Sequence, residues 1–128
     1  MTTNKVITAL NAVTATTTSN KFYVGDASRV AFLFRRADHS AGSTSFAVKV
    51  SMDPAGTATP VMTTLNLLID NVTNTNAQTL TRVAAKVLSA NGDAFLFLDP
   101  FVKINWVEIT ATETTDGTHS AFILVETD

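Results

Sequence analysis

The two histidines carry the most versatile side chains of this sequence, and each has an aspartate nearby. His39 directly follows Asp38, and His119 lies three residues after Asp116. An imidazole beside a carboxylate can bind a transition metal or take part in acid–base catalysis. Both pairs fall in segments rich in Asp, Gly, Ser and Thr, which are typical of turns, so a shared site would require two separate loops to converge. We therefore interpret both histidines as solvent-exposed turn residues and expect no metal or other cofactor.

The motifs of other catalytic centres are absent from the sequence. The chain has no cysteine, which excludes a disulfide scaffold and a thiolate zinc site. It contains neither a Gly-x-Ser-x-Gly turn nor a glycine-rich nucleotide loop. Glu108, Glu113 and Glu126 lie towards the C-terminal end, but nothing in their spacing selects a pair for glycoside hydrolysis. We predict that the protein is not an enzyme.

Composition indicates one globular domain, residues 1–128, rich in β-structure. Of its 128 residues, 45% are hydrophobic and only 16% are charged. A chain of this length can bury a core without metals or disulfides, and uncharged polar groups, chiefly threonines, must cover its surface. Threonine is β-branched, which favours strands, while its hydroxyl can face water. Such a chain is typical of proteins that belong to assemblies, and an ordinary β-sandwich with threonine on its wet faces is an equally good interpretation.

Charge and hydropathy exclude two classes of partner. The net charge is −2, and the nine Lys and Arg residues are scattered, with Arg35-Arg36 as their one adjacent pair. A row of phosphates cannot be neutralised by such a pattern, so we expect no nucleic-acid binding. No apolar run approaches the length of a membrane helix, and the stretch after Lys5 is too short for a signal peptide. We expect a soluble protein made in the cytoplasm and no membrane partner.

Apolar residues alternate with polar ones in many short runs, which is the pattern of half-buried strands. The clearest run covers residues 45–52 and places Phe46, Val48, Val50 and Met52 on one face. Further runs cover residues 62–69 and 106–112. Residues 29–36, 94–98 and 120–125 are apolar on both or nearly both faces, as expected of central strands. Their regular spacing predicts an all-β fold, namely an antiparallel two-sheet β-sandwich, jelly-roll-like, with about eight strands. We expect hairpins at the loop over 37–44 and at the Asp116-Gly117 turn.

Two segments leave alternatives open. Residues 79–88 fit a helix face, but they also alternate, and the all-β context favours a strand. Along residues 101–112 the apolar positions change face, and a β-bulge near Trp106-Val107 would reconcile them. Nine apolar residues are predicted to be buried between the two sheets: Phe32, Phe34, Phe46, Val48, Val50, Leu65, Leu67, Val107 and Ile109.

The order of these features resembles a class of small tailed-phage virion proteins, the head decoration (auxiliary) proteins and related small β-sandwich components. The resemblance is carried by residues 29–34, by residues 46–53, by residues 106–112 and by the Thr- and Gly-rich last hairpin, over roughly residues 20–126. It implies a non-enzymatic structural protein of the virion that binds the major capsid protein lattice and stabilises the particle. The family also implies a symmetric homo-oligomer, with a trimer favoured.

Two other functions remain open. One is a tail or adsorption component of the same kind of particle. The other, a carbohydrate-binding module, is raised by the aromatic residues, which include Tyr23 and Trp106. Sugar platforms need several exposed, coplanar Trp and Tyr rings, and this chain has one of each.

We expect the partner to be bound by a terminus and a loop. Residues 1–5 are short and polar, so we expect a flexible arm that becomes ordered against a neighbour. The polar loop over 53–60 has a proline near each end, which limits its freedom and reduces the entropy lost on docking. The predicted partner-binding residues are Thr2, Thr3, Asn4, Lys5, Pro54 and Pro60.

Overall fold

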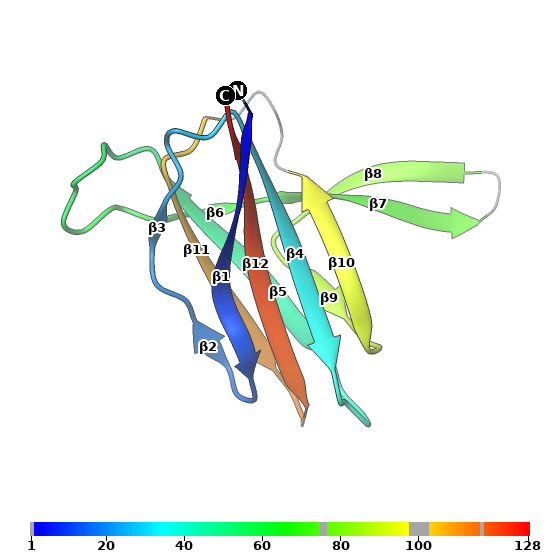
Figure 1. The fold of residues 1–128 in the computed structure, drawn as a ribbon. Helices are drawn as coiled ribbons and strands as arrows, with labels where there is room; N and C mark the ends of the chain where they lie inside the picture. Colours follow the sequence, from blue (N-terminus) through cyan, green and yellow to red (C-terminus); the bar gives the residue numbers. More distant parts are fainter. Residues whose placement is uncertain (1, 75–76, 98–102, 116) are drawn as a thin grey trace.

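All regular elements in the described part of the chain are β-strands. The computed structural model describes residues 2–74, 77–97, 103–115 and 117–128 (Figure 1), and only the backbone is described for residues 68–74, 77–81 and 97. The strands are β1 (Thr3–Val13), β2 (Thr17–Thr18), β3 (Phe22–Tyr23), β4 (Arg29–Ala37), β5 (Thr44–Ser51), β6 (Thr63–Leu65), β7 (Leu67–Asn74), β8 (Ala77–Val83), β9 (Lys86–Leu88), β10 (Gly92–Phe97), β11 (Trp106–Glu113) and β12 (Thr118–Thr127). Over these residues, no helix has the length and apolar character needed to span a membrane.

The strands form two facing antiparallel sheets (Figure 1). The four-stranded sheet has the order β1-β12-β4-β10, and the six-stranded sheet has the order β2-β11-β5-β6, with β3 also paired to β11 and β9 to β5. Strands β7 and β8 form a separate hairpin that projects from the side of the sandwich. The predicted two-sheet β-sandwich is confirmed.

The pairing is nested from the ends of the chain inward. The first strand β1 pairs with the last strand β12, β2 and β3 pair with β11, β4 pairs with β10, and β5 pairs with β6 and β9. This is the arrangement of a jelly roll, in which one long antiparallel ribbon is wrapped into two sheets. Because β2 and β3 lie along one edge of β11, and β6 and β9 along one edge of β5, the ribbon has eight strand positions, as the sequence predicts.

Both hairpins expected from turn residues are wrong. The connections from β4 to β5 and from β11 to β12 each cross from one sheet to the other, so the strands that they join are not hydrogen-bonded partners. Gly, Asp and Ser allow the chain to reverse direction, but they do not determine which edge the next strand joins. Since β4, β5, β11 and β12 all have an apolar inward face, crossing satisfies their pattern as well as pairing would.

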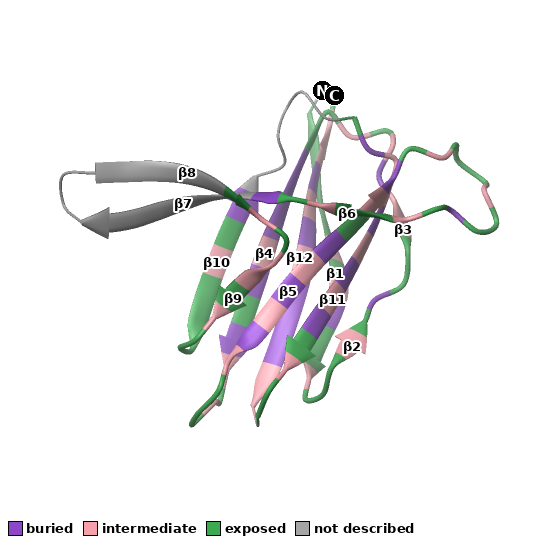
Figure 2. Cartoon of the chain, turned by 180° about the vertical axis from the view of Figure 1, so that it is seen from behind, coloured by how far each residue is buried: buried purple, intermediate pink, exposed green. Residues whose placement is uncertain are grey.

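The core lies between the two sheets, and buried residues recur along the strands of both (Figure 2). Phe34 of the four-stranded sheet stacks on Phe46 of the six-stranded sheet at a centroid distance of 4.6 Å, and both side chains are fully buried. Of the predicted core, Phe32, Phe34, Phe46, Val48, Leu67, Val107 and Ile109 are buried, while Val50 and Leu65 are partly buried and pack against them. The interior therefore follows the predicted apolar faces.

The two open segments are also resolved. Residues 79–88 contribute to β8 and β9, so the strand interpretation is confirmed. The predicted bulge at Trp106-Val107 is wrong, because β11 pairs with β5 in one unbroken register from Trp106 to Glu113. Ile104 is buried just before this strand begins, so the buried face changes at its start and not within it.

The expected flexible arm over residues 1–5 is wrong for Thr3, Asn4 and Lys5. These residues belong to β1 and pair with Thr127, Glu126 and Val125 of β12. The side chains at this end of β1 are exposed, since the strand is an edge of the four-stranded sheet and its outer rows face water. A polar segment can therefore form a strand through its backbone alone, which the sequence pattern does not reveal.

Candidate functional site

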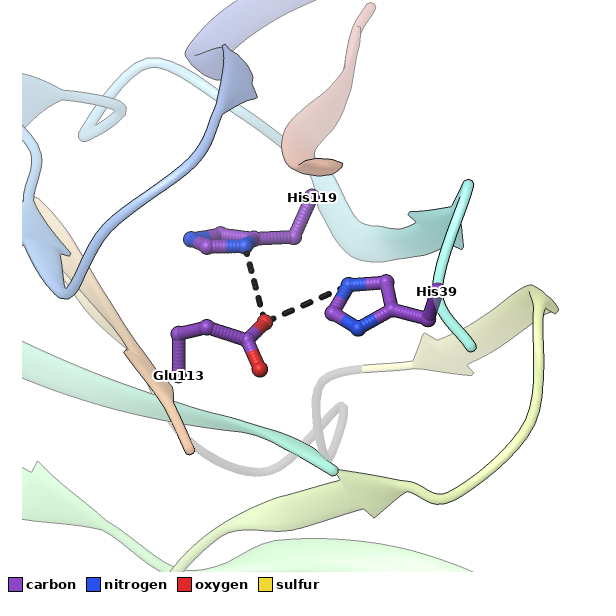
Figure 3. A group of neighbouring side chains, drawn as sticks. All are labelled: His39, Glu113 and His119. Atoms are coloured by element: carbon purple, nitrogen blue, oxygen red, sulfur yellow. Dashed lines mark ion pairs between the residues drawn. The ribbon is translucent and has the colours of Figure 1, made fainter. Parts of the chain in front are cut away.

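The connections from β4 to β5 and from β11 to β12 meet at one end of the sandwich, which we call the crossing end. His39 follows β4, Glu113 is the last residue of β11, and His119 is the second residue of β12 (Figure 3). The three side chains point towards one another from these separate segments. The interpretation of both histidines as solvent-exposed turn residues is therefore wrong, because the two loops do converge.

The three side chains form a compact, buried cluster. Nε2 of His39 lies 3.2 Å from Oε2 of Glu113, and Nδ1 of His119 lies 3.4 Å from the same oxygen. One potential ligand atom from each residue lies within 4.8 Å of the others. The exposed fractions of the side chains are 0% for both histidines and 3% for the glutamate. We call these three residues the His–Glu–His cluster.

Strand alternation places two of the three members. Glu113 shares the parity of Val107, Ile109 and Ala111, which all face the core. His119 likewise shares the parity of the inward residues Ala121, Ile123 and Val125. Both residues directly adjoin the expected strand runs 106–112 and 120–125, so the inward parity of each is a signal that the sequence contains.

Backbone geometry places the third member, His39, for which the sequence gives no periodic signal. Asp38 has a positive φ of 57°, which turns the chain just before the histidine. The side chain of Asn91 bonds both backbone groups of His39, accepting from N at 3.1 Å and donating to O at 3.2 Å. Gly117 has φ +107°, and a Cβ there would lie 2.1 Å from Cδ2 of His39, so the next turn packs directly on the imidazole.

Glu113 is held by hydrogen bonds from several segments. Its Oε1 accepts from the backbone N–H groups of Thr114 and Thr115 at 2.9 Å each, and its Oε2 accepts from Oγ1 of Thr44 at 2.7 Å. Burial opposes ionisation, but the hydrogen bonds of Thr115, Thr44 and Thr114, together with the nearby His39, hold the pKa of Glu113 below its usual range. The cluster thus contains a buried carboxylate with its charge retained.

The histidine nitrogens that face Glu113 lack hydrogen bonds of acceptable geometry. Nε2 of His119 lies 3.0 Å from the carbonyl oxygen of Ala15, which can only accept, so this nitrogen carries a proton. In a neutral ring the other nitrogen, Nδ1, then presents a lone pair towards the carboxylate. Nδ1 of His119 and both ring nitrogens of His39 have no hydrogen-bond partner although they are buried. Two imidazole nitrogens and one carboxylate oxygen therefore face one another in a buried space without a hydrogen bond between them.

The predicted partner-binding residues lie at the opposite end, which we call the terminal end. Asn4 and Lys5 line a groove of about 350 Å³ between β1, β12 and β4. Thr2 and Thr3 are exposed beside it, as is Pro54 in the loop over 53–60. Pro60 is buried, so it anchors the base of its loop and does not present a surface.

The loop over 53–60 projects from the terminal end on a firmly held base (Figure 1). The indole Nε1 of Trp106 donates to the carbonyl of Asp53 at 3.1 Å, and Nδ2 of Asn105 donates to the same carbonyl at 3.1 Å. A carboxylate oxygen of Asp53 accepts from the backbone of Val61 at 2.7 Å, which closes the loop. The tip of the loop is thus presented in a restricted set of positions.

The aromatic pair considered for carbohydrate binding does not form a platform. The rings of Tyr23 and Trp106 meet edge to face, with planes 71° apart and centroids 5.3 Å apart. Both residues are only partly exposed, and the indole N–H of Trp106 is used by the loop base. The two rings cannot stack on one sugar together.

The outer surface of the four-stranded sheet carries a continuous apolar patch, which we call the outer face. Phe95 of β10, Leu33 of β4 and Phe122 of β12 lie side by side in register across three strands. Leu124 of β12 continues the patch and pairs with Val6 of β1. Val6 and Phe95 are 60% and 51% exposed, and the other three side chains are partly exposed.

Comparison with known proteins identifies a fold but no family. No family model matches the chain, and no curated protein matches it in sequence. Among solved structures, the SPBc2 prophage-derived protein YomS superposes with a TM-score of 0.66 at 12% identity, over 99% of this chain and 96% of that one. An infectious bursal disease virus structure (Gx strain) superposes with a TM-score of 0.46, at 12% identity, over 99% of this chain and 33% of that one. This chain therefore shares an end-to-end β-sandwich fold with a prophage-derived protein.

Proposed function

We propose that this protein is a structural component of a phage particle, specifically a capsid decoration protein that binds the major capsid protein and stabilises the shell. The observation that carries the proposal is the outer face, where apolar side chains of four neighbouring strands lie together on the outside of one sheet. Patches of this kind mark contacts with other proteins. The shared fold with a prophage-derived protein and the resemblance to decoration proteins support a place in the virion.

The outer face serves contact with a second copy of the same chain. The patch is bordered by two ion pairs, Arg35 with Asp93 at 2.9 Å and Arg29 with Glu126 at 3.7 Å. Each pair is internally balanced, so two copies of this face can approach each other without net repulsion. The family resemblance favours a trimer. The groove at the terminal end shares Val6 and Leu124 with the outer face. In this arrangement the held loop over 53–60 and the polar rim at Asn4 and Lys5 are left to contact the capsid.

Purified particles provide the first test of the proposed function. Cells producing the virus that encodes this chain are lysed, particles are banded on a density gradient, and the chain is detected with an antibody. The proposal predicts that the chain sediments with full particles and labels the head. Absence from the particles would overturn the proposal, and labelling confined to the tail would replace it with a tail component.

A pair of matched variants tests the role of the outer face. Phe95→Glu places a charge on the outer face, whereas Val87→Glu places one on β9, at a side chain of nearly the same exposure (51% and 49%). We expect Phe95→Glu to shift the mass found by light scattering towards the monomer and Val87→Glu to leave it unchanged. A wild-type chain that is monomeric at high micromolar concentration would contradict self-association in solution.

A further inference from the structure

We propose that the His–Glu–His cluster is a binding site for a divalent transition-metal ion, best matched by Zn²⁺, which ties the two sheets together at the crossing end. Two imidazoles and one carboxylate form a donor set that Zn²⁺ takes in proteins. Neither the resemblance to virion proteins nor the shared fold assigns such a site.

The unpaired nitrogen atoms carry this inference. The Nε2 proton of His119 is committed to the carbonyl of Ala15, at 3.0 Å, so Nδ1 of a neutral ring faces the Glu113 carboxylate with a lone pair. Nε2 of His39 faces the same oxygen and has no hydrogen-bond partner. Buried polar atoms without partners are costly. A metal ion between these atoms would use all three of them as ligands.

The spacing fits an ion. Two ligands each about 2.1 Å from a tetrahedral Zn²⁺ lie about 3.4 Å apart. The two nitrogen–oxygen distances of the cluster are 3.2 and 3.4 Å, and the three potential ligand atoms lie within 4.8 Å of one another. Both nitrogen–oxygen distances therefore match the separation of two ligands on one Zn²⁺ ion.

The surroundings of the cluster have the features of a metal site. The histidines and carboxylates that bind metals usually hydrogen-bond their remaining atoms to neighbouring groups, which orients them. His119 does so through Ala15, and Glu113 does so through Thr44 and the backbone of Thr114 and Thr115.

The ion has a structural role. The three side chains are at most 3% exposed, so a substrate has no access to the ion. His39 and His119 belong to the four-stranded side of the two crossings, and Glu113 ends a strand of the six-stranded sheet. One ion would therefore link the four-stranded sheet, through β12 and the residue pair after β4, to the end of β11 in the six-stranded sheet.

Zinc binding by the untagged chain tests the proposal. The protein is dialysed against EDTA, the chelator is removed, and Zn²⁺ is titrated by calorimetry, with thermal unfolding followed in parallel. We expect one Zn²⁺ per chain and a rise in Tm of roughly 8–12 °C when free Zn²⁺ is about a hundred times Kd. The chain has only two histidines and no cysteine, so an imidazole site has no alternative location.

Three variants separate this site from adventitious surface binding. Glu113→Gln keeps the shape of the side chain and removes its charge, and His39→Gln removes a ligand contributed by a loop; each should weaken Zn²⁺ binding by at least about a hundredfold and abolish the rise in Tm. Asp93→Asn removes an exposed carboxylate, 44% accessible, and should bind Zn²⁺ like the wild type.

The outcomes that would overturn the proposal are definite. Failure of the wild-type chain to bind Zn²⁺ at millimolar concentration would overturn the proposal. The cluster would then be held together by a proton between an imidazole and the carboxylate. Binding that survives both Glu113→Gln and His39→Gln would place the metal elsewhere. If Glu113→Gln does not fold, anomalous scattering at the zinc edge from wild-type crystals decides instead, with a peak expected between Nε2 of His39 and Nδ1 of His119.

Discussion

The two ends of the sandwich use polar residues in opposite ways. At the crossing end, polar side chains turn inward and are buried: Glu113 and His119 occupy positions that continue the apolar faces of β11 and β12. At the terminal end, polar residues such as Asn4, Lys5 and Thr57 lie on edges and loops, at or near the surface. Polar side chains are therefore buried at the crossing end and mostly accessible to solvent at the terminal end.

This difference teaches where each kind of function can reside. A buried polar cluster is costly unless every charge and lone pair has a partner, so its residues are constrained by one another and by any ion that they hold. Exposed polar residues carry no such constraint, so their side chains can adjust when a partner binds. We therefore assign stability to the crossing end and recognition to the terminal end.

Truncation of Phe46 should have the largest effect. Its ring stacks on Phe34 at 4.6 Å and meets the His119 imidazole edge-on at 6.3 Å, so it joins the apolar core to the His–Glu–His cluster. Phe46→Ala should lower the free energy of unfolding by about 3–5 kcal/mol, as measured by urea denaturation. Phe95→Ala, on the outer face, is the control and should change it by less than about 1 kcal/mol. Equal effects would show that the two sites are equally buried in solution.

Alanine substitution of two glycines with positive φ, one at each end, compares how tightly the two ends are packed. Gly117 (φ +107°) packs on His39, whereas Gly56 (φ +82°) in the loop over 53–60 has nothing within 4 Å of an added Cβ. Both alanine variants introduce backbone strain of about 1 kcal/mol, and Gly117→Ala must also displace the imidazole, for a total of about 2–3 kcal/mol. Thermal unfolding of both variants measures the difference. Identical losses would mean that His39 does not pack on this turn.

Deletion of residues 2–5 should affect stability less and partner binding more. The deletion removes the first pairs of β1 with β12, at a sheet edge whose side chains are exposed, and should cost about 1 kcal/mol. Retention on particles should fall, because Asn4 and Lys5 line the terminal groove. The substitution Lys5→Ala is a milder form that should weaken retention and leave the Tm unchanged. Unchanged retention in both variants would remove this groove from the docking surface.

The smallest expected effect is the pH response of an exposed ion pair. The hydrogen bond from Arg35 holds the pKa of Asp93 below its ordinary value of 3.8. A carboxylate whose pKa is depressed on folding stabilises the protein above 3.8 and loses that contribution as the pH falls below this value, through its folded pKa. In Arg35→Gln, an NMR titration should find the pKa of Asp93 closer to 3.8. A titration that matches the wild type would show that the pair is open in solution.

Alternation revealed more of the fold than of the site. The faces of β4, β5 and β11 follow directly from a period of two, so the sandwich and most of its core are predictable from residues such as Phe34, Phe46 and Ile109. The pairing of strands was harder, since the turns after β4 and β11 are compatible with a hairpin or with a crossing. The turn residues therefore predict that the chain reverses direction, but not which sheet the next strand joins.

The His–Glu–His cluster depended on that unpredicted crossing. Glu113 and His119 have the inward parity of their strands, which is a signal that the sequence contains. The position of His39 depends instead on the positive φ of Asp38 and on the missing side chain of Gly117. Neither feature produces a periodic pattern in the sequence. A histidine beside an Asp-Gly turn is therefore not necessarily exposed.

Hydrogen exchange on the free and particle-bound chain tests the division between the two ends most directly. The account predicts that binding to particles protects backbone amides of residues 3–6 and 53–60, while those of His39, Glu113 and His119 exchange as they do in the free chain. Protection gained at the crossing end, with the terminal end unchanged, would contradict it and would move recognition to the His–Glu–His cluster.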